Sequence, residues 1–286
     1  MTNYNTWIFL VVLYALLKGA RECMKKAALK KSGTNEILFL YTFLGFLMTL
    51  PYARSALSID PVYIFYAFLK SAACCTAWIL SLTALKRMSV SLYSVMDLGR
   101  VVFSTLLGVF VLGESFTPQK AIGMLLVIAG LLLVNAKKNA SASGATAIAL
   151  LAVLLNCLFN AISGMLDKIL MKSIEPNQLQ FWFMLFLCLL YGCGLLIRRD
   201  RISFKTLIKN PWISLMSVSL VVGDLLLFKA NANPQSQVTL MTLIKQSSVI
   251  VSVFSGWLFF KEKNIAYKLL CTAVIVAGIM IPLLFS

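Results

Sequence analysis

Long apolar runs separated by short polar stretches make up most of the chain. The runs cover residues 7–24, 37–53, 62–84, 92–112 and 121–136, and then residues 145–166, 179–197, 212–228, 238–260 and 266–285. A helix needs about 20 residues to cross the hydrocarbon core of a bilayer. Lipid cannot satisfy free backbone groups, and the runs lack the alternation of barrel strands. The pattern therefore predicts an all-α integral membrane protein with ten transmembrane helices.

The second set of five runs repeats features of the first. Residues 18–41 align without gaps on residues 160–183, and, at a slightly different offset, Glu114 aligns with Glu262. An odd number of spans per copy makes the second copy enter the membrane the other way up. We therefore expect two inverted five-helix repeats, residues 1–138 and 145–286, with a binding site at their interface near the bilayer midplane.

Composition and charge agree with a location in the membrane. The chain is 60% hydrophobic, and its 26 Lys and Arg residues outnumber its 10 Asp and Glu residues, which gives a net charge of +16. Most of the positive residues lie between the apolar runs, where they meet lipid headgroups and set the orientation. The expected partners are therefore membrane lipids and no nucleic acid.

The sequence shows no nucleophile and base pair at a spacing useful for catalysis. The sequence contains no His, and its seven Cys residues all lie inside apolar stretches, without the spacing of metal ligands. No Gly-rich phosphate loop is present either. We expect no catalytic residue, no metal and no cofactor, so an enzyme is the weakest functional hypothesis.

Charged residues inside the first span are the first candidates for a binding site. Lys18, Arg21 and Glu22 share one helical face with Tyr14 and Lys25, because they are spaced by three and four residues. A charge in the middle of a bilayer is costly, so such residues are functional candidates. We assign Lys18, Arg21 and Glu22 to the binding of a solute.

The fourth span carries a second polar face, with Tyr93, Asp97 and Arg100. The repeat offset places Asp97 on Lys245 and Arg100 on Ser248 in the ninth span. Residues related in this way can face each other across a pseudo-two-fold axis, so we expect an ion pair between Asp97 and Lys245. The alternative is a pair between Asp97 and Arg100, one turn along the same helix.

The remaining candidates lie on the third, sixth and eighth spans. They are Lys70, Trp78, Asn160 and Asp224. Spans one, three, four, six, eight and nine thus carry polar faces. Spans two, five, seven and ten are mostly apolar, which suits the lipid side or packing in a homodimer.

Several short motifs resemble those of a known family. The segment Thr83-Ala84-Leu85-Lys86-Arg87, the turn Gly113-Glu114-Ser115, Gln119, and Gly123 with Gly130 in the next apolar helix are similar to the EamA-type repeat of the drug/metabolite transporter superfamily. The resemblance implies a multi-pass transporter of the inner (plasma) membrane. The inverted repeats around a central polar site indicate a secondary carrier that works by alternating access. The chain departs from the family at Lys18-Gly19, where a Trp-Gly is common, and at Leu98-Gly99-Arg100-Val101, where a Pro is common. The resemblance implies both termini inside the cell, whereas the basic residues in the connections favour both termini outside.

The charges of the candidate residues indicate the class of solute. The deeper basic groups outnumber the acidic ones by about two, which favours an anionic or zwitterionic metabolite. Glu22, Asp97 or Asp224 could also titrate and couple transport to protons. Two alternatives remain: a flippase or flippase subunit for a lipid-linked phosphate, and a multidrug exporter, which would need carboxylates in an aromatic cage.

Overall fold

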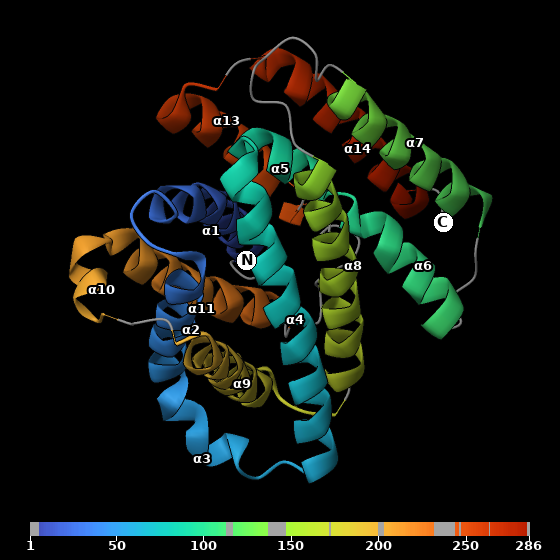
Figure 1. Cartoon of the computed structure of the whole chain (residues 1–286). Helices are drawn as coiled ribbons and strands as arrows, with labels where there is room; N and C mark the ends of the chain where they lie inside the picture. Colours follow the sequence, from blue (N-terminus) through green and yellow to red (C-terminus); the bar gives the residue numbers. More distant parts are fainter. Residues whose placement is uncertain are drawn as a thin grey trace.

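The computed structural model is built of helices wherever it describes long stretches of the chain (Figure 1). It describes residues 6–112, 117–136, 147–171, 173–199, 203–231, 244–245, 247–262 and 264–284. The long helices of the first half are α1 (Thr6–Ala28), α2 (Thr34–Thr49), α4 (Pro61–Arg87), α5 (Val90–Asp97), α6 (Arg100–Leu112) and α7 (Pro118–Ala136). Those of the second half are α8 (Ala147–Leu170), α9 (Pro176–Arg198), α11 (Pro211–Asn231), α13 (Ser248–Phe260) and α14 (Ile265–Leu284). Short helices η1 (Leu50–Tyr52), α3 (Ala53–Ala56) and α10 (Lys205–Lys209) extend the connections.

Many of these helices have the length and apolarity of membrane spans. Within the described residues, five stretches meet both requirements: Thr34–Ala56, Pro61–Arg87, Val90–Val111, Ala147–Asp167 and Pro176–Ile197. Shorter apolar helices cover Pro118–Val134, Pro211–Leu227, Ser248–Phe260 and Ile265–Gly278. The fold is that of an all-α membrane protein built from two repeats, as the sequence predicts.

Helices of the two halves pack against each other in pairs that respect the repeat. Helix α2 packs against its counterpart α9, and α7 packs against its counterpart α14. Helix α1 of the first half packs against α11 of the second, and the repeat relates this pair to α8 of the second half against α4 of the first. Figure 1 shows α7 and α14 side by side at one edge of the bundle, and α4 beside α8 nearer its middle.

The fourth predicted span, residues 92–112, is interrupted where the sequence analysis expects one helix. Helix α5 ends at Asp97 and α6 begins at Arg100, and the turn between them is tightened by bonds from the Gly99 N–H to the Met96 carbonyl (3.0 Å) and from the Val102 N–H to the Gly99 carbonyl (3.1 Å). Such three-residue spacing belongs to a 3₁₀ turn. The break places the polar groups of Asp97 and Arg100 at a discontinuity between two helices.

The same turn recurs in the second half at the positions that the repeat offset relates. There the Ser247 N–H bonds the Ile244 carbonyl (3.1 Å) and the Ile250 N–H bonds the Ser247 carbonyl (2.9 Å). Helix α13 then begins at Ser248, as α6 begins at Arg100. The first residues of the predicted ninth span, 238–243, lie outside the described residues.

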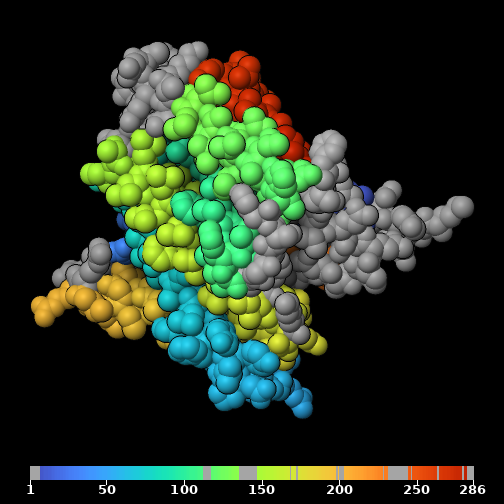
Figure 2. Space-filling model, turned by 90° about the vertical axis from the view of Figure 1, so that its right-hand side faces the viewer, coloured from blue at the N-terminus to red at the C-terminus, as the bar shows by residue number. Residues whose placement is uncertain are grey.

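The outer surface is largely apolar, as contact with lipid requires. Figure 2 shows one face, on which the green α6 and α7 lie beside the yellow-green α8. Exposed side chains on these helices include Phe110, Leu125, Leu132 and Leu151. Between α7 and α14 the backbones approach closely, because a Cβ on Gly278 of α14 would stand 2.7 Å from the Gly123 carbonyl oxygen of α7. Small residues commonly allow such close packing between membrane helices.

The turn after α13 connects the second half to the first through the Glu262 cluster, which comprises Glu262, Lys268, Ser89, Val90 and Ser91. The Glu262 Oε1 accepts a hydrogen bond from the Val90 N–H (2.7 Å), and its Oε2 accepts bonds from the N–H of Ser91 (3.2 Å) and from the Ser91 hydroxyl. The Lys268 Nζ lies 3.1 Å from Oε2 and also donates to the Ser89 Oγ at 3.2 Å. A carboxylate of one half thereby caps the N-terminus of α5 in the other half.

Candidate functional site

A cavity of about 300 Å³ lies between the two halves. Its wall comes from α1, α2, α4, α5, α6, α8, α9 and α11, together with Lys245. Six basic and four acidic side chains face it: Lys18, Arg21, Lys25, Lys70, Arg100 and Lys245, and Glu22, Asp97, Asp167 and Asp224. The lining therefore carries more positively than negatively charged side chains. A polar cavity of this kind allows a membrane protein to hold ionisable groups away from lipid.

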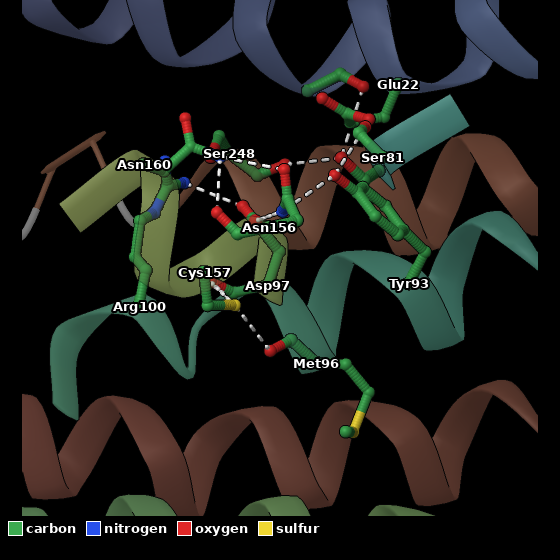
Figure 3. Close-up of polar contacts among 12 residues, drawn as sticks. Glu22, Ser81, Tyr93, Met96, Asp97, Arg100, Asn156, Cys157, Asn160 and Ser248 are labelled. Carbon is green, nitrogen blue, oxygen red and sulfur yellow. Dashed lines mark hydrogen bonds and ion pairs between the residues drawn. The ribbon is translucent and has the colours of Figure 1, made fainter. Parts of the chain in front are cut away.

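A continuous chain of hydrogen bonds crosses one side of the cavity (Figure 3). The Ser81 Oγ on α4 lies 2.6 Å from the Tyr93 hydroxyl on α5. The side-chain amide of Asn156 on α8 donates to the Tyr93 hydroxyl (3.3 Å) and to the Asp97 Oδ1 (2.9 Å). Asn160, one turn further along α8, donates to the Asn156 Oδ1 at 2.8 Å. Asparagine side chains of the second half thus hold the polar face of the fourth span in place.

Asp97 completes this chain with an ion pair inside its own span. Its Oδ2 lies 2.8 Å from Nη2 of Arg100, across the break between α5 and α6. The expected pair between Asp97 and Lys245 is therefore wrong, and the alternative is correct. Arg100 follows Asp97 by only three residues, so its guanidinium can reach the Asp97 carboxylate within the same span.

A second ion pair joins the two halves at another part of the wall. The Lys70 Nζ on α4 lies 3.0 Å from Oδ1 of Asp167 on α8 and 3.7 Å from the centre of the Phe183 ring on α9. The Lys70 side chain is 8% exposed and the Asp167 side chain 40% exposed. The lysine is thus held by a carboxylate and by an aromatic face at once.

Other charges of the cavity are not balanced in this way. Within the part of the chain that the structure describes, Lys18, Arg21, Lys245 and Asp224 form no ion pair, whereas Lys25 pairs with Glu22 at 2.8 Å. Arg21 is buried, and its Nη1 has no hydrogen-bond partner among the described residues. Three basic groups and one acidic group are therefore left to interact with whatever enters the cavity.

The candidate residues from the sequence analysis come together, with one exception. Those that line the cavity are Lys18, Arg21, Glu22, Lys70, Trp78, Tyr93, Asp97, Arg100, Asn160, Asp224 and Lys245. Ser248 does not line it. A Cβ on Gly19 of α1 would stand only 2.6 Å from the Ser248 carbonyl oxygen, so this first turn of α13 serves to pack two helices closely. The binding roles of the lining residues stay predictions.

The second and seventh spans also contribute to the cavity, although their mostly apolar sequences do not predict it. Tyr41 of α2 and the residues Leu179, Gln180 and Phe183 of α9 also line the cavity. The Tyr41 ring lies 5.2 Å from that of Trp78, which in turn lies 6.1 Å from that of Phe183. One signal was available: Gln180 is a polar residue in an apolar run, three positions before Phe183 and hence on the same helical face.

The cysteines behave as small membrane residues. All seven carry thiols that are not joined in disulfide bonds, and Cys74 lines the cavity. The Cys157 Sγ lies 3.6 Å from the carbonyl oxygens of Met96 and Asp97, next to the break between α5 and α6. Within the described part of the chain, no three His, Cys, Asp or Glu residues are grouped as a metal site would require.

Comparison with known proteins is informative about the fold and the family. A model of the EamA-like transporter family matches the chain twice, over residues 5–136 and 147–284. A solved structure described only as "Crystal structure of protein" superposes with a TM-score of 0.66 at 15% identity, over 96% of this chain and 95% of that chain. At such low identity this likeness supports the fold alone. No curated protein matches the sequence.

Proposed function

The chain belongs to the EamA-like transporter family, and from this premise we propose that it carries a small anionic or zwitterionic metabolite across the cell membrane by alternating access. Members of the family are transporters, which fits a multi-pass protein surrounded by membrane lipids. The two repeats would rock about the cavity between them. The observation that carries the proposed solute class is the set of unbalanced basic groups in that cavity.

The charge surplus and the size of the cavity favour such a solute. Lys18, Arg21 and Lys245 face the hollow without an ion pair to described residues, against Asp224 alone. A carboxylate or phosphate would supply the missing negative charge. The volume of about 300 Å³ lies at the lower end of the range for small-molecule sites. An organic cation would meet the wrong electrostatic potential, and a large lipid-linked sugar phosphate would need more room.

Asp224 is our candidate for the group that couples transport to protons. Asp97 is paired with Arg100 and Glu22 with Lys25, whereas Asp224 forms no ion pair with a described residue. A carboxylate without a fixed partner can exchange its proton as the solute enters and leaves. Uptake into proteoliposomes driven by a pH gradient should lose its dependence on that gradient in Asp224→Asn. If this variant keeps the full dependence, the coupling group lies elsewhere.

A ligand screen tests the solute class. The purified protein would be heated in the presence of carboxylates, phosphates, amino acids and organic cations, and each stabilising compound would then be tested for saturable uptake into proteoliposomes. We expect stabilisation by anions or zwitterions, and an uptake at least about tenfold weaker in Lys245→Ala, since a charge-assisted bond contributes more than a neutral one.

The matched control is Lys31→Ala, which removes an exposed lysine that does not line the cavity. It should transport as the wild type does. Stabilisation by organic cations alone would contradict the proposal and favour a multidrug exporter. An effect confined to lipid-linked phosphates would favour a flippase.

A further inference from the structure

Gln180 is a buried polar residue that the hydrogen-bond network of the cavity leaves unused. Its side chain is 1% exposed and lines the cavity from α9. Neither its Oε1 nor its Nε2 has a hydrogen-bond partner among the described residues. Most buried polar groups in folded proteins are satisfied, so an amide with both ends free calls for an explanation.

Four of the six buried side-chain atoms that lack a hydrogen-bond partner among the described residues belong to residues that line this cavity. The other lining atoms without a partner are Nη1 of Arg21 and Oε2 of Glu22. By contrast, the chain of bonds through Tyr93, Asn156 and Asp97 uses nearly all the polar groups on its side. The polar groups on one side of the cavity therefore bond one another, whereas those on the other side are available to hydrogen-bond a ligand.

The amide of Gln180 specifies the kind of group that would complement it. It presents one acceptor and one donor in a single plane. A planar group that both donates and accepts can form two bonds with it, whereas an ester or a carboxylate only accepts and an ammonium only donates. Exchange of the amide oxygen and nitrogen leaves this complement unchanged, so the conclusion does not depend on how the amide is oriented.

The surroundings of Gln180 indicate where the rest of the solute would lie. Phe183, one turn along α9, packs against Lys70 and Trp78, and Trp78 packs against Tyr41. Arg21 lies beside the Tyr41 hydroxyl. An aromatic wall therefore connects the amide of Gln180 to Arg21, whose Nη1 has no hydrogen-bond partner among the described residues.

We propose that Gln180 is a specificity-determining residue that contacts the solute, and that the solute carries both an anionic group and a planar carboxamide-type group, such as a carboxamide, ureido or lactam group. The inference rests on the proposed function, because the anionic group is assigned to the basic side of the same cavity. Gln180 adds selection among anions, by rejecting those that leave its amide unsatisfied.

The test compares probes that differ at the distal group. Succinamate, 3-ureidopropionate and monomethyl succinate are small monoanions, and only the first two end in a group that both donates and accepts. Their dissociation constants would be measured with the purified full-length protein in nanodiscs. We expect the wild type to bind the two amide-type anions about tenfold more tightly than the ester, because the ester cannot donate to the Gln180 Oε1 and leaves that buried oxygen unsatisfied. In Gln180→Met this preference should fall to less than about twofold.

Gln178→Met is the matched control, since it removes the same side chain from the same helix but outside the cavity. Gln178 bonds the Glu175 N–H and the Ser55 carbonyl instead. The control should keep the tenfold preference, and Gln180→Met should unfold at or above the wild-type temperature, because it removes an unsatisfied amide.

Four results would decide against one of the two proposals. Equal binding of the ester and the amides by the wild type overturns the role of Gln180 without the need for any variant. A preference that survives in Gln180→Met, or that is lost equally in Gln178→Met, overturns it as well. If no anion of any kind binds the wild type while organic cations do, the proposed function itself fails.

Discussion

The Glu262 cluster and the cavity both enclose charge between the two halves, but they satisfy it to different degrees. In the cluster, the Glu262 side chain is 8% exposed and receives hydrogen bonds on both oxygens, with Lys268 to balance its charge. In the cavity, Arg21 is about equally buried, at 6% exposure, yet its Nη1 has no partner among the described residues.

This difference indicates a division of labour. Burial of a charge costs free energy unless it is paired and hydrogen-bonded, so the cluster is built as a structural joint should be. In the cavity, buried polar groups stay without partners among the described residues, and a bound solute would supply them. Such a departure from local rules is expected at a functional site. Stability should therefore depend on the cluster, and binding on the cavity.

Substitution of Glu262 should give the largest loss of stability. Glu262→Ala leaves Lys268 and the first amides of α5 without their acceptor, and breaking a buried pair typically costs about 3 kcal/mol. Thermal unfolding in detergent would show a marked fall in Tm, with a smaller fall for Glu262→Gln, which keeps one acceptor oxygen. An unchanged Tm in Glu262→Ala would show that the joint between the halves lies elsewhere.

The ion pair between Lys70 and Asp167 should show an intermediate and asymmetric effect. Lys70 is the more buried partner, so Asp167→Asn leaves an enclosed charge and should cost about 2 kcal/mol, whereas Lys70→Met leaves a carboxylate that is 40% exposed and should cost about 1 kcal/mol. Unfolding of both variants and of the double variant would measure the coupling energy. Equal costs for the two single variants would contradict this order.

The sequence predicts the helices, the repeat and the meeting of the charged helix faces inside the protein. These features follow from the spacing of apolar residues and from the free-energy cost of placing a charge in lipid. The sequence does not predict the partners within the cavity. From the sequence, both Arg100 and Lys245 are possible partners of Asp97. The structure pairs Asp97 with Arg100, across the turn at Gly99 that the sequence pattern does not reveal.

Apolar composition hides two contributors for a related reason. Tyr41 and Gln180 lie in helices that are otherwise suited to lipid, and a single polar residue gives no periodic signal. Ser248 is the opposite case, because it is predicted to bind the solute and does not line the cavity. The repeat offset places it correctly at the start of a helix but does not show the close approach of Gly19. Side-chain direction depends on packing between distant segments, which the pattern of one helix does not contain.

A smaller effect on stability should follow from the hydrogen bond between Ser81 and Tyr93. Ser81→Ala removes one bond of 2.6 Å, while Tyr93 keeps its bond from Asn156, so the expected loss is about 1 kcal/mol. Thr76→Ala on the same helix is the control, since its exposed hydroxyl bonds only the Ala72 carbonyl and should contribute almost nothing. Similar losses in the two variants would mean that the bonded network has no special weight.

Arg21→Met should have the smallest effect on stability and a large effect on function, which makes it the sharpest test of the comparison. The substitution removes a charge whose burial is only partly compensated, so Tm should stay within about the error of measurement or rise, in contrast to Glu262→Ala. Uptake of an anionic solute should fall at least about tenfold, because the bonds from the guanidinium to that solute are lost. Parallel measurement of Tm and uptake distinguishes the two roles: a fall in Tm as large as that of Glu262→Ala would make Arg21 a structural residue, and unchanged uptake would remove it from the binding site.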